Sequence, residues 1–75
     1  MPAYILISLK EADEEKILKK LMEMNEVEEA HILFGEWDLI AKISLDKPEE
    51  LGTFVMEKIR PLKEIKLTST LIVAK

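Results

Sequence analysis

Hydrophobic positions in the first half of the chain follow two different spacings, which separate strands from helices. Residues 3–9 (AYILISL) form an apolar run of strand length, and residues 27–34 (VEEAHILF) form a second β-rich segment. Between these segments, Asp13 is suited to cap a helix. The apolar side of that predicted helix consists of Ile17, Leu18, Leu21 and Met24. The first half therefore predicts strand, helix and strand.

The second half of the chain contains a second amphipathic segment with clear end signals. Asp46 and Glu49 have the spacing of a capping box, and Pro48 suits a first helical turn. Pro61 ends the segment, because proline cannot continue a helix. The apolar side of this predicted helix consists of Leu51, Phe54, Val55, Ile59 and Leu62.

Two further strands, residues 38–45 and 65–74, flank the second helix, and Gly35 begins the turn that leads into the first of them. The whole order is β-α-β-β-α-β. With right-handed crossovers it predicts an α+β, ferredoxin-like sandwich: a four-stranded antiparallel sheet in the order 4-1-3-2, with two helices on one face. We expect one domain over residues 1–75.

The two faces of this sheet are predicted to differ, because side chains alternate along a strand. The set expected to face the helices is apolar except for Ser69. Its apolar members are Ala3, Ile5, Ile7, Leu9, Leu39, Ala41, Ile43, Ile65, Leu67, Leu71 and Val73. On the other face, the strands bring together Tyr4, Leu6, Ile40 and Ile72. An apolar patch on an uncovered sheet marks an interface, so we predict a dimer of sheets packed face to face. The alternative is scattered surface apolar residues.

A polar cluster is predicted beside this patch. Strands 3 and 4 run parallel to each other on either side of strand 1, so one end of the sheet collects residues from all three. On the helix-free face, alternation assigns to that end Asp38, Thr68, Thr70, Ser8 and Lys10. Trp37, next to Asp38, is a large ring at a hairpin turn and is expected to cover a pocket or enter an interface.

Composition excludes several classes of function. The chain has 75 residues, no cysteine and a net charge of −4, which argues against thiol chemistry and direct binding of nucleic acid. No apolar run spans a bilayer and no signal peptide begins at Met1, so we expect a cytoplasmic protein without membrane contact. Abundant Glu and Lys with no Gln predict a thermophilic source. A core this small favours oligomerisation.

Few residues in the sequence are candidates for catalysis or metal binding. His31 is the only histidine, so we predict no metal site and interpret it as a strand surface or interface residue. No cofactor is expected, because the chain lacks a glycine-rich phosphate loop. General base catalysis by Asp38 is conceivable, but the sequence supplies no partner for it.

The order of these motifs resembles the C-terminal effector domain of the Lrp/AsnC family of amino-acid-responsive transcription regulators, also called the RAM domain. The resemblance covers essentially the whole chain. It includes the AYILI strand, Val27 after the first helix, the GEWDLIAKI stretch and the IKLTSTLIV strand. A glycine-x-aromatic-aspartate turn and a Thr-x-Thr pair characterise the family. Here they are Gly35, Trp37 and Asp38, with Thr68 and Thr70.

The resemblance implies a stand-alone effector domain, since the helix-turn-helix half of the family is absent from this sequence. It also implies homodimers that assemble further, into octamers or decamers, and a small effector, commonly an amino acid, bound where dimers meet. The residues implied to bind that effector are Gly35, Trp37, Asp38, Thr68 and Thr70. Phe34 departs from the family, which often has threonine there.

Three hypotheses follow for function. The first is an amino-acid-sensing or metabolite-sensing domain that joins or modulates full-length Lrp/AsnC regulators, with Asp38 pairing an ammonium group and threonine hydroxyls serving a carboxylate. The alternatives are a small dimeric enzyme with Asp38 as general base, and a purely structural oligomer. For Asp38 itself, an ion pair with Lys10 or Lys42 remains an alternative. Thr68 and Thr70 are also common residues of half-exposed strands.

Overall fold

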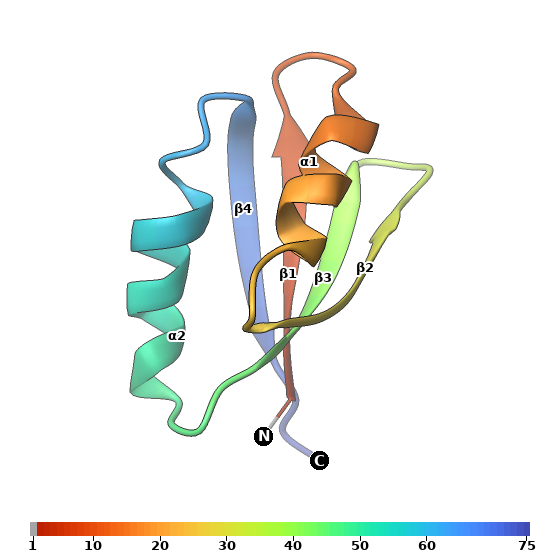
Figure 1. Ribbon diagram of the computed structural model, residues 1–75. Helices are drawn as coiled ribbons and strands as arrows, with labels where there is room; N and C mark the ends of the chain where they lie inside the picture. The colour runs from red at the N-terminus through yellow and green to blue at the C-terminus, as the bar shows by residue number, and fades with distance from the viewer. Residues whose placement is uncertain (1) are drawn as a thin grey trace.

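A computed structural model describes residues 2–75 of the chain (Figure 1). Its elements are β1 (Pro2–Leu9), α1 (Glu14–Met22), β2 (Val27–Ile32), β3 (Leu39–Ser44), α2 (Glu49–Phe54), a π-helical continuation η1 (Val55–Ile59), and β4 (Ile65–Ile72). All neighbouring strands are antiparallel, in the order β2-β3-β1-β4, which is the predicted 4-1-3-2 order read from the other edge. Both helices cover one face of the sheet (Figure 1). The predicted ferredoxin-like fold is confirmed.

The hydrophobic core lies between the helices and the sheet. From the sheet, Ile5, Ile7, Leu39 and Ala41 reach it and are completely buried. The helices contribute Ile17, Leu21, Leu51, Phe54, Val55 and Ile59. The predicted alternation is therefore confirmed for β1 and β3, and the buried apolar residues of both helices pack on the sheet.

The predicted faces of the last strand are wrong beyond Ile65, because β4 contains a β-bulge; Ile65 itself packs against the core as predicted. Leu9 pairs with Ile65, whereas the preceding Ser8 pairs with Leu67, so Lys66 is an extra residue on the β4 side of the ladder. One extra residue shifts a strand by half of its two-residue period, so every later side chain changes face.

Beyond the bulge, Thr68 pairs with Ile7 and Thr70 with Ile5. Residues directly opposite each other in a ladder share a face, so both threonines lie on the helix side of the sheet. Ile72, expected in the helix-free patch, also turns to the helix side. Leu67 and Leu71, expected to face the helices, lie on the helix-free face and are 57% and 47% exposed. Val73, also expected inside, follows the end of β4 and is 38% exposed.

The helix ends depart from the sequence signals by short distances. Asp13 occupies the N-cap position of α1, but its side chain makes no cap hydrogen bond. At α2, Pro48 is the N-cap, and the backbone N–H of Lys47 donates to the Glu50 carboxylate at 2.9 Å. The reciprocal bond of the predicted capping box therefore forms one residue later than Asp46 and Glu49 suggested.

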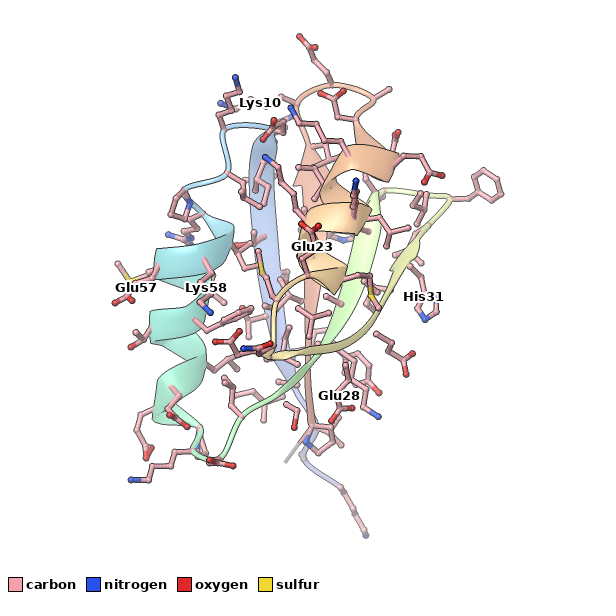
Figure 2. All side chains as sticks on the ribbon, viewed as in Figure 1. Lys10, Glu23, Glu28, His31, Glu57 and Lys58 are labelled. Carbon is pink, nitrogen blue, oxygen red and sulfur yellow. The ribbon has the colours of Figure 1, made fainter. Side chains whose placement is uncertain are left out.

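Two ion pairs tie the helical layer to distant parts of the chain. Lys58 of η1 points toward the loop between α1 and β2 (Figure 2), where its Nζ donates to both carboxylate oxygens of Glu26 at 3.0 and 2.9 Å. This bond lowers the pKa of Glu26. The Nζ of Lys16 on α1 lies 2.8 Å from Oε2 of Glu64, a buried carboxylate just before β4.

Candidate ligand-binding site

The turn between β2 and β3 is built on Gly35. Its φ is +123°, a left-handed conformation that side-chain-bearing residues rarely adopt, so glycine is required there. The backbone N–H of Leu33 donates to the Asp38 carbonyl at 2.8 Å and closes the turn. At the tip, Phe34 is fully exposed, while Trp37 is half-buried. The prediction that Gly35 makes this bend is confirmed.

Asp38 anchors the turn to β1. Its backbone N–H donates to the Ile7 carbonyl at 2.9 Å, and its Oδ2 accepts from the backbone N–H of Leu9 at 2.7 Å. The carboxylate is half-buried and lies on the helix-free side, since the adjacent Leu39 faces the core. Its second oxygen, Oδ1, retains lone pairs for a ligand.

The alternative ion pairs for Asp38 do not form. Among residues 2–75, the four ion pairs leave Asp38 out, and Lys42 instead lies 3.5 Å from Glu28. The backbone N–H of Lys10 donates to the Glu64 carbonyl at 2.9 Å, and this bond joins the segment after β1 to the segment before β4. Asp38 therefore acts in the protomer as a backbone cap.

The two threonines lie along hollows beside β4, and the hollow at Thr68 is also lined by Leu67 of the helix-free face. Thr70 borders a groove between α2 and β4, of about 350 Å³, which we call the α2–β4 groove. Its lining residues are Pro48, Leu51, Gly52, Val55, Met56, Arg60, Thr70 and Ile72. Thr68 borders an adjoining hollow that it shares with Arg60 and Lys66.

Arg60 is a residue that sequence reasoning did not assign to a site. It is the only arginine in the chain and lines both hollows beside the threonines. Its position follows from the π-helical turn, in which the backbone N–H of Arg60 donates to the Val55 carbonyl at 2.9 Å. A lone arginine at a predicted helix end was the available signal, but the bulge had to be known to place the threonines next to it.

The predicted site residues therefore form two groups in one protomer. Gly35, Trp37 and Asp38 cluster at the β2–β3 turn, and Asp38 shares the helix-free face with Ser8. Thr68 and Thr70 lie on the opposite face. The polar cluster predicted on one face does not form, because the bulge at Lys66 reverses the threonines. The sheet therefore separates the two groups within one copy.

The helix-free face of the sheet is apolar at its centre, as predicted for Tyr4, Leu6 and Ile40. Leu67 and Leu71 extend this patch in place of Ile72. His31 lies at the β2 edge, opposite Ile40, and points outward (Figure 2). Its Nε2 lies 3.0 Å from Oε1 of Glu29, and this contact lowers the pKa of that carboxyl.

Neither a metal-binding group nor a membrane-spanning helix is found among the described residues. Within residues 2–75, no three His, Cys, Asp or Glu side chains are grouped in a way that could hold a metal ion. Over the same residues, no helix has the length and apolar character needed to cross a membrane.

Comparison with known proteins defines the class of molecule. Residues 2–75 match the family model of the Lrp/AsnC ligand binding domain, and the chain belongs to this family. It is 39% identical over 70 residues to the regulatory protein AsnC of Haemophilus influenzae, covering 92% of this chain and 47% of that protein. It is 32% identical over 59 residues to an HTH-type transcriptional regulator of Pyrococcus furiosus, covering 79% of this chain and 39% of that protein.

Solved structures agree with this membership. FFRP-DM1 superposes with a TM-score of 0.90 and 42% identity, over 96% of each chain. AsnC of E. coli superposes with a TM-score of 0.91 and 33% identity, over 99% of this chain and 50% of the other. The chain spans less than half of the length of the curated relatives cited above. Those relatives are transcription regulators, which argues against an enzyme, and the Pyrococcus relative fits the predicted thermophilic source.

Proposed function

We propose that this domain senses an amino acid or a related small metabolite at a site completed by a second copy of the chain, and that it performs no chemistry. The observation that carries the proposal is the separation of the two groups of site residues. Asp38 and the threonines lie on opposite faces of one protomer, so both can serve one ligand only if different copies supply them. Membership of a ligand-binding family supports the sensing role.

The recognition chemistry follows from the groups at the turn. The Oδ1 atom of Asp38 accepts a hydrogen bond from the ammonium group of the ligand, while Oδ2 keeps its hydrogen bond from the backbone N–H of Leu9. Gly35 has no atom within 4 Å of the place where a Cβ would sit, so a ligand can approach the backbone there. Trp37 shields this contact from water. The hydroxyl groups of Thr68 and Thr70 from another copy serve the carboxylate.

The second copy first meets the helix-free face. Tyr4, Leu6 and Ile40 form an apolar centre there, and Leu67 and Leu71 remain about half exposed in the protomer. Packing two such sheets together removes this apolar area from water, which drives association. We propose a homodimer of this kind, its further assembly into octamers or decamers, and modulation of full-length Lrp/AsnC regulators by co-assembly.

Isothermal titration calorimetry with the common amino acids tests the sensing role. Asp38→Asn removes the charge but keeps an oxygen for the Leu9 N–H, so it isolates ligand binding from folding. We expect at least one amino acid to bind saturably, and Asp38→Asn to weaken it about tenfold or more, as for a lost charge-assisted hydrogen bond. Glu23→Gln, a surface carboxylate after α1, is the control and should bind normally (Figure 2).

The other possible results each support an alternative hypothesis or contradict the proposed one. An assembled chain that binds no amino acid favours the purely structural oligomer. Chemical conversion of a bound compound, lost in Asp38→Asn, favours the enzyme with Asp38 as general base. Equal affinity of Asp38→Asn and the unaltered chain contradicts the assignment of Asp38 to the ammonium group.

A further inference from the structure

Two irregularities of the backbone place cations beside one hollow. The π-helical turn η1 ends next to Arg60, whose backbone N–H donates to the Val55 carbonyl at 2.9 Å. The extra residue of the β4 bulge is Lys66. π-helical turns are frequent at functional sites, and β-bulges re-aim side chains there. Both residues border a hollow of about 360 Å³, which we call the cation hollow and which is lined by Arg60, Ile65, Lys66, Leu67 and Thr68.

The cation hollow is positively charged in an otherwise acidic chain. The chain has 15 acidic residues against 11 lysines and arginines, with a net charge of −4. Among residues 2–75, however, no Asp or Glu lines the cation hollow or the α2–β4 groove, and Arg60 lines both. The four ion pairs within the same residues include neither Arg60 nor Lys66. Two unpaired cations at a concave surface favour the binding of an anion.

The two cations lie next to the threonines that the proposed function assigns to the ligand. Thr68 lines the cation hollow, and Thr70 borders the groove that Arg60 also lines. A guanidinium group binds a carboxylate through two parallel N–H donors, whereas a hydroxyl group donates a single hydrogen bond. The β4 side of the site therefore offers donors for two carboxylates, one at the hydroxyl groups and one at the cations.

The charges of the proposed site indicate the charge of its ligand. Asp38 is negative and Arg60 and Lys66 are positive, so the three residues together carry one excess positive charge. An amino acid with a neutral side chain pairs its ammonium group with Asp38 and its α-carboxylate with one cation, and it leaves the other cation unpaired. A second carboxylate on the ligand removes this mismatch, and such complementarity of charge determines specificity.

We propose that the ligand is an acidic amino acid, aspartate or glutamate, and that Arg60 and Lys66 bind its side-chain carboxylate. This inference rests on the proposed function and names the class of ligand for the same site. Arg60 is the main specificity-determining residue, because its planar fork matches a carboxylate, whereas Lys66 contributes a point charge. Asparagine and glutamine have nearly the same shape as the two acids but lack the charge, so they bind more weakly.

Isothermal titration calorimetry with matched pairs of amino acids tests this specificity. Glutamate is compared with glutamine, and aspartate with asparagine, on the assembled chain. We expect the acid of at least one pair to bind about tenfold or more tightly than its amide, as for one charge-assisted hydrogen bond. Arg60→Gln should abolish this preference. Lys63→Gln, which removes a charge from an exposed residue that lines neither the cation hollow nor the α2–β4 groove, is the control and should keep it.

The affinity for the amides shows whether Arg60 contacts the ligand or only supports the site. If Arg60 binds the side-chain carboxylate, Arg60→Gln weakens the acid and leaves the amide unchanged. An equal loss of affinity for both members of a pair overturns the assignment, because a structural defect does not distinguish the two ligands. Circular dichroism checks that the variant is folded. Lys66→Gln, at the exposed bulge, provides the same comparison if Arg60→Gln fails to fold.

The outcomes separate this inference from the proposed function. If a neutral amino acid binds at least as tightly as aspartate and glutamate, the acidic specificity is wrong and the sensing role stands. If glutarate, which lacks the ammonium group, binds while no amino acid does, the cation hollow keeps its carboxylate and the sensing of an amino acid is wrong. If none of these compounds binds, both proposals are wrong.

Discussion

Asp38 serves the fold and the candidate site with different atoms. Its backbone N–H and its Oδ2 bond to Ile7 and Leu9, which places the aspartate across the end of β1. Its Oδ1 remains available to a ligand. The sequence showed an aspartate at the start of an apolar strand after a glycine turn, and this made Asp38 a candidate site residue. It could not show the bond to Leu9, because the register between β1 and β3 depends on the folded sheet.

Asp38→Ala should therefore destabilise the protomer even without ligand. It leaves the partly buried N–H of Leu9 without an acceptor, which costs about 1–3 kcal/mol in the free energy of unfolding. Asp38→Asn should cost less, because its amide oxygen still accepts that bond. Urea denaturation measures both. An Asp38→Ala chain as stable as the unaltered one contradicts the capping role.

The elements could be predicted from the sequence more securely than the faces that they present. Alternation along β1 and β3 gave the correct core, since Ile5, Ile7, Leu39 and Ala41 are all completely buried. The bulge at Lys66 was not predictable, because Ile65, Leu67 and Leu71 alternate as in a regular strand and only Ser69 interrupts the pattern. The site inherited this error: the turn residues were placed correctly, and the threonines were placed on the wrong face.

A pair of substitutions on β4 tests the bulge. Leu71→Asp puts a charge into the helix-free patch, whereas Thr70→Asp puts one on the helix side at the open groove. Leu71→Asp should abolish the sheet-to-sheet dimer, because an unpaired carboxylate is costly to bury at an apolar interface. Thr70→Asp should leave that dimer intact. Light scattering measures both, and the reverse result would restore the unbulged register.

The ion pair between α1 and the start of β4 makes stability depend on pH. The pKa of Glu64 is lowered, first by its close contact with the Lys16 ammonium group, and the pKa of Lys16 is raised by the same contact. A lowered carboxyl pKa contributes stability that is present above the ordinary value of 4.5 and is lost as the pH falls through the folded value. The raised pKa of Lys16 contributes stability that is present below 10.5 and is lost only above it.

Glu64→Gln should consequently lower the free energy of unfolding at pH 7, and the deficit should shrink as the pH falls below about 4.5. Denaturant unfolding of both chains between pH 2.5 and pH 7 follows the difference. A deficit that stays constant over this whole range means that packing of the side chain, rather than its charge, holds the loop before β4.

Three features of this small protomer are exposed on its surface. The helix-free face carries an apolar patch, the β2–β3 turn carries an exposed ring, and the α2–β4 groove carries an unpaired arginine. The two groups of predicted ligand contacts are also divided between the faces. A chain of 75 residues has a small core, and the proposed association would add both stability and a second wall for the candidate site.

Under the proposed function, ligand binding requires more than one copy of the chain. Calorimetric titration of the best-binding amino acid into the unaltered chain and into Leu71→Asp tests it most directly, with circular dichroism to confirm that the variant is folded. We expect saturable binding by the assembled chain and at least tenfold weaker binding by the monomeric variant. Equal affinity in the two, or no binding by any amino acid to the assembled chain, would contradict it.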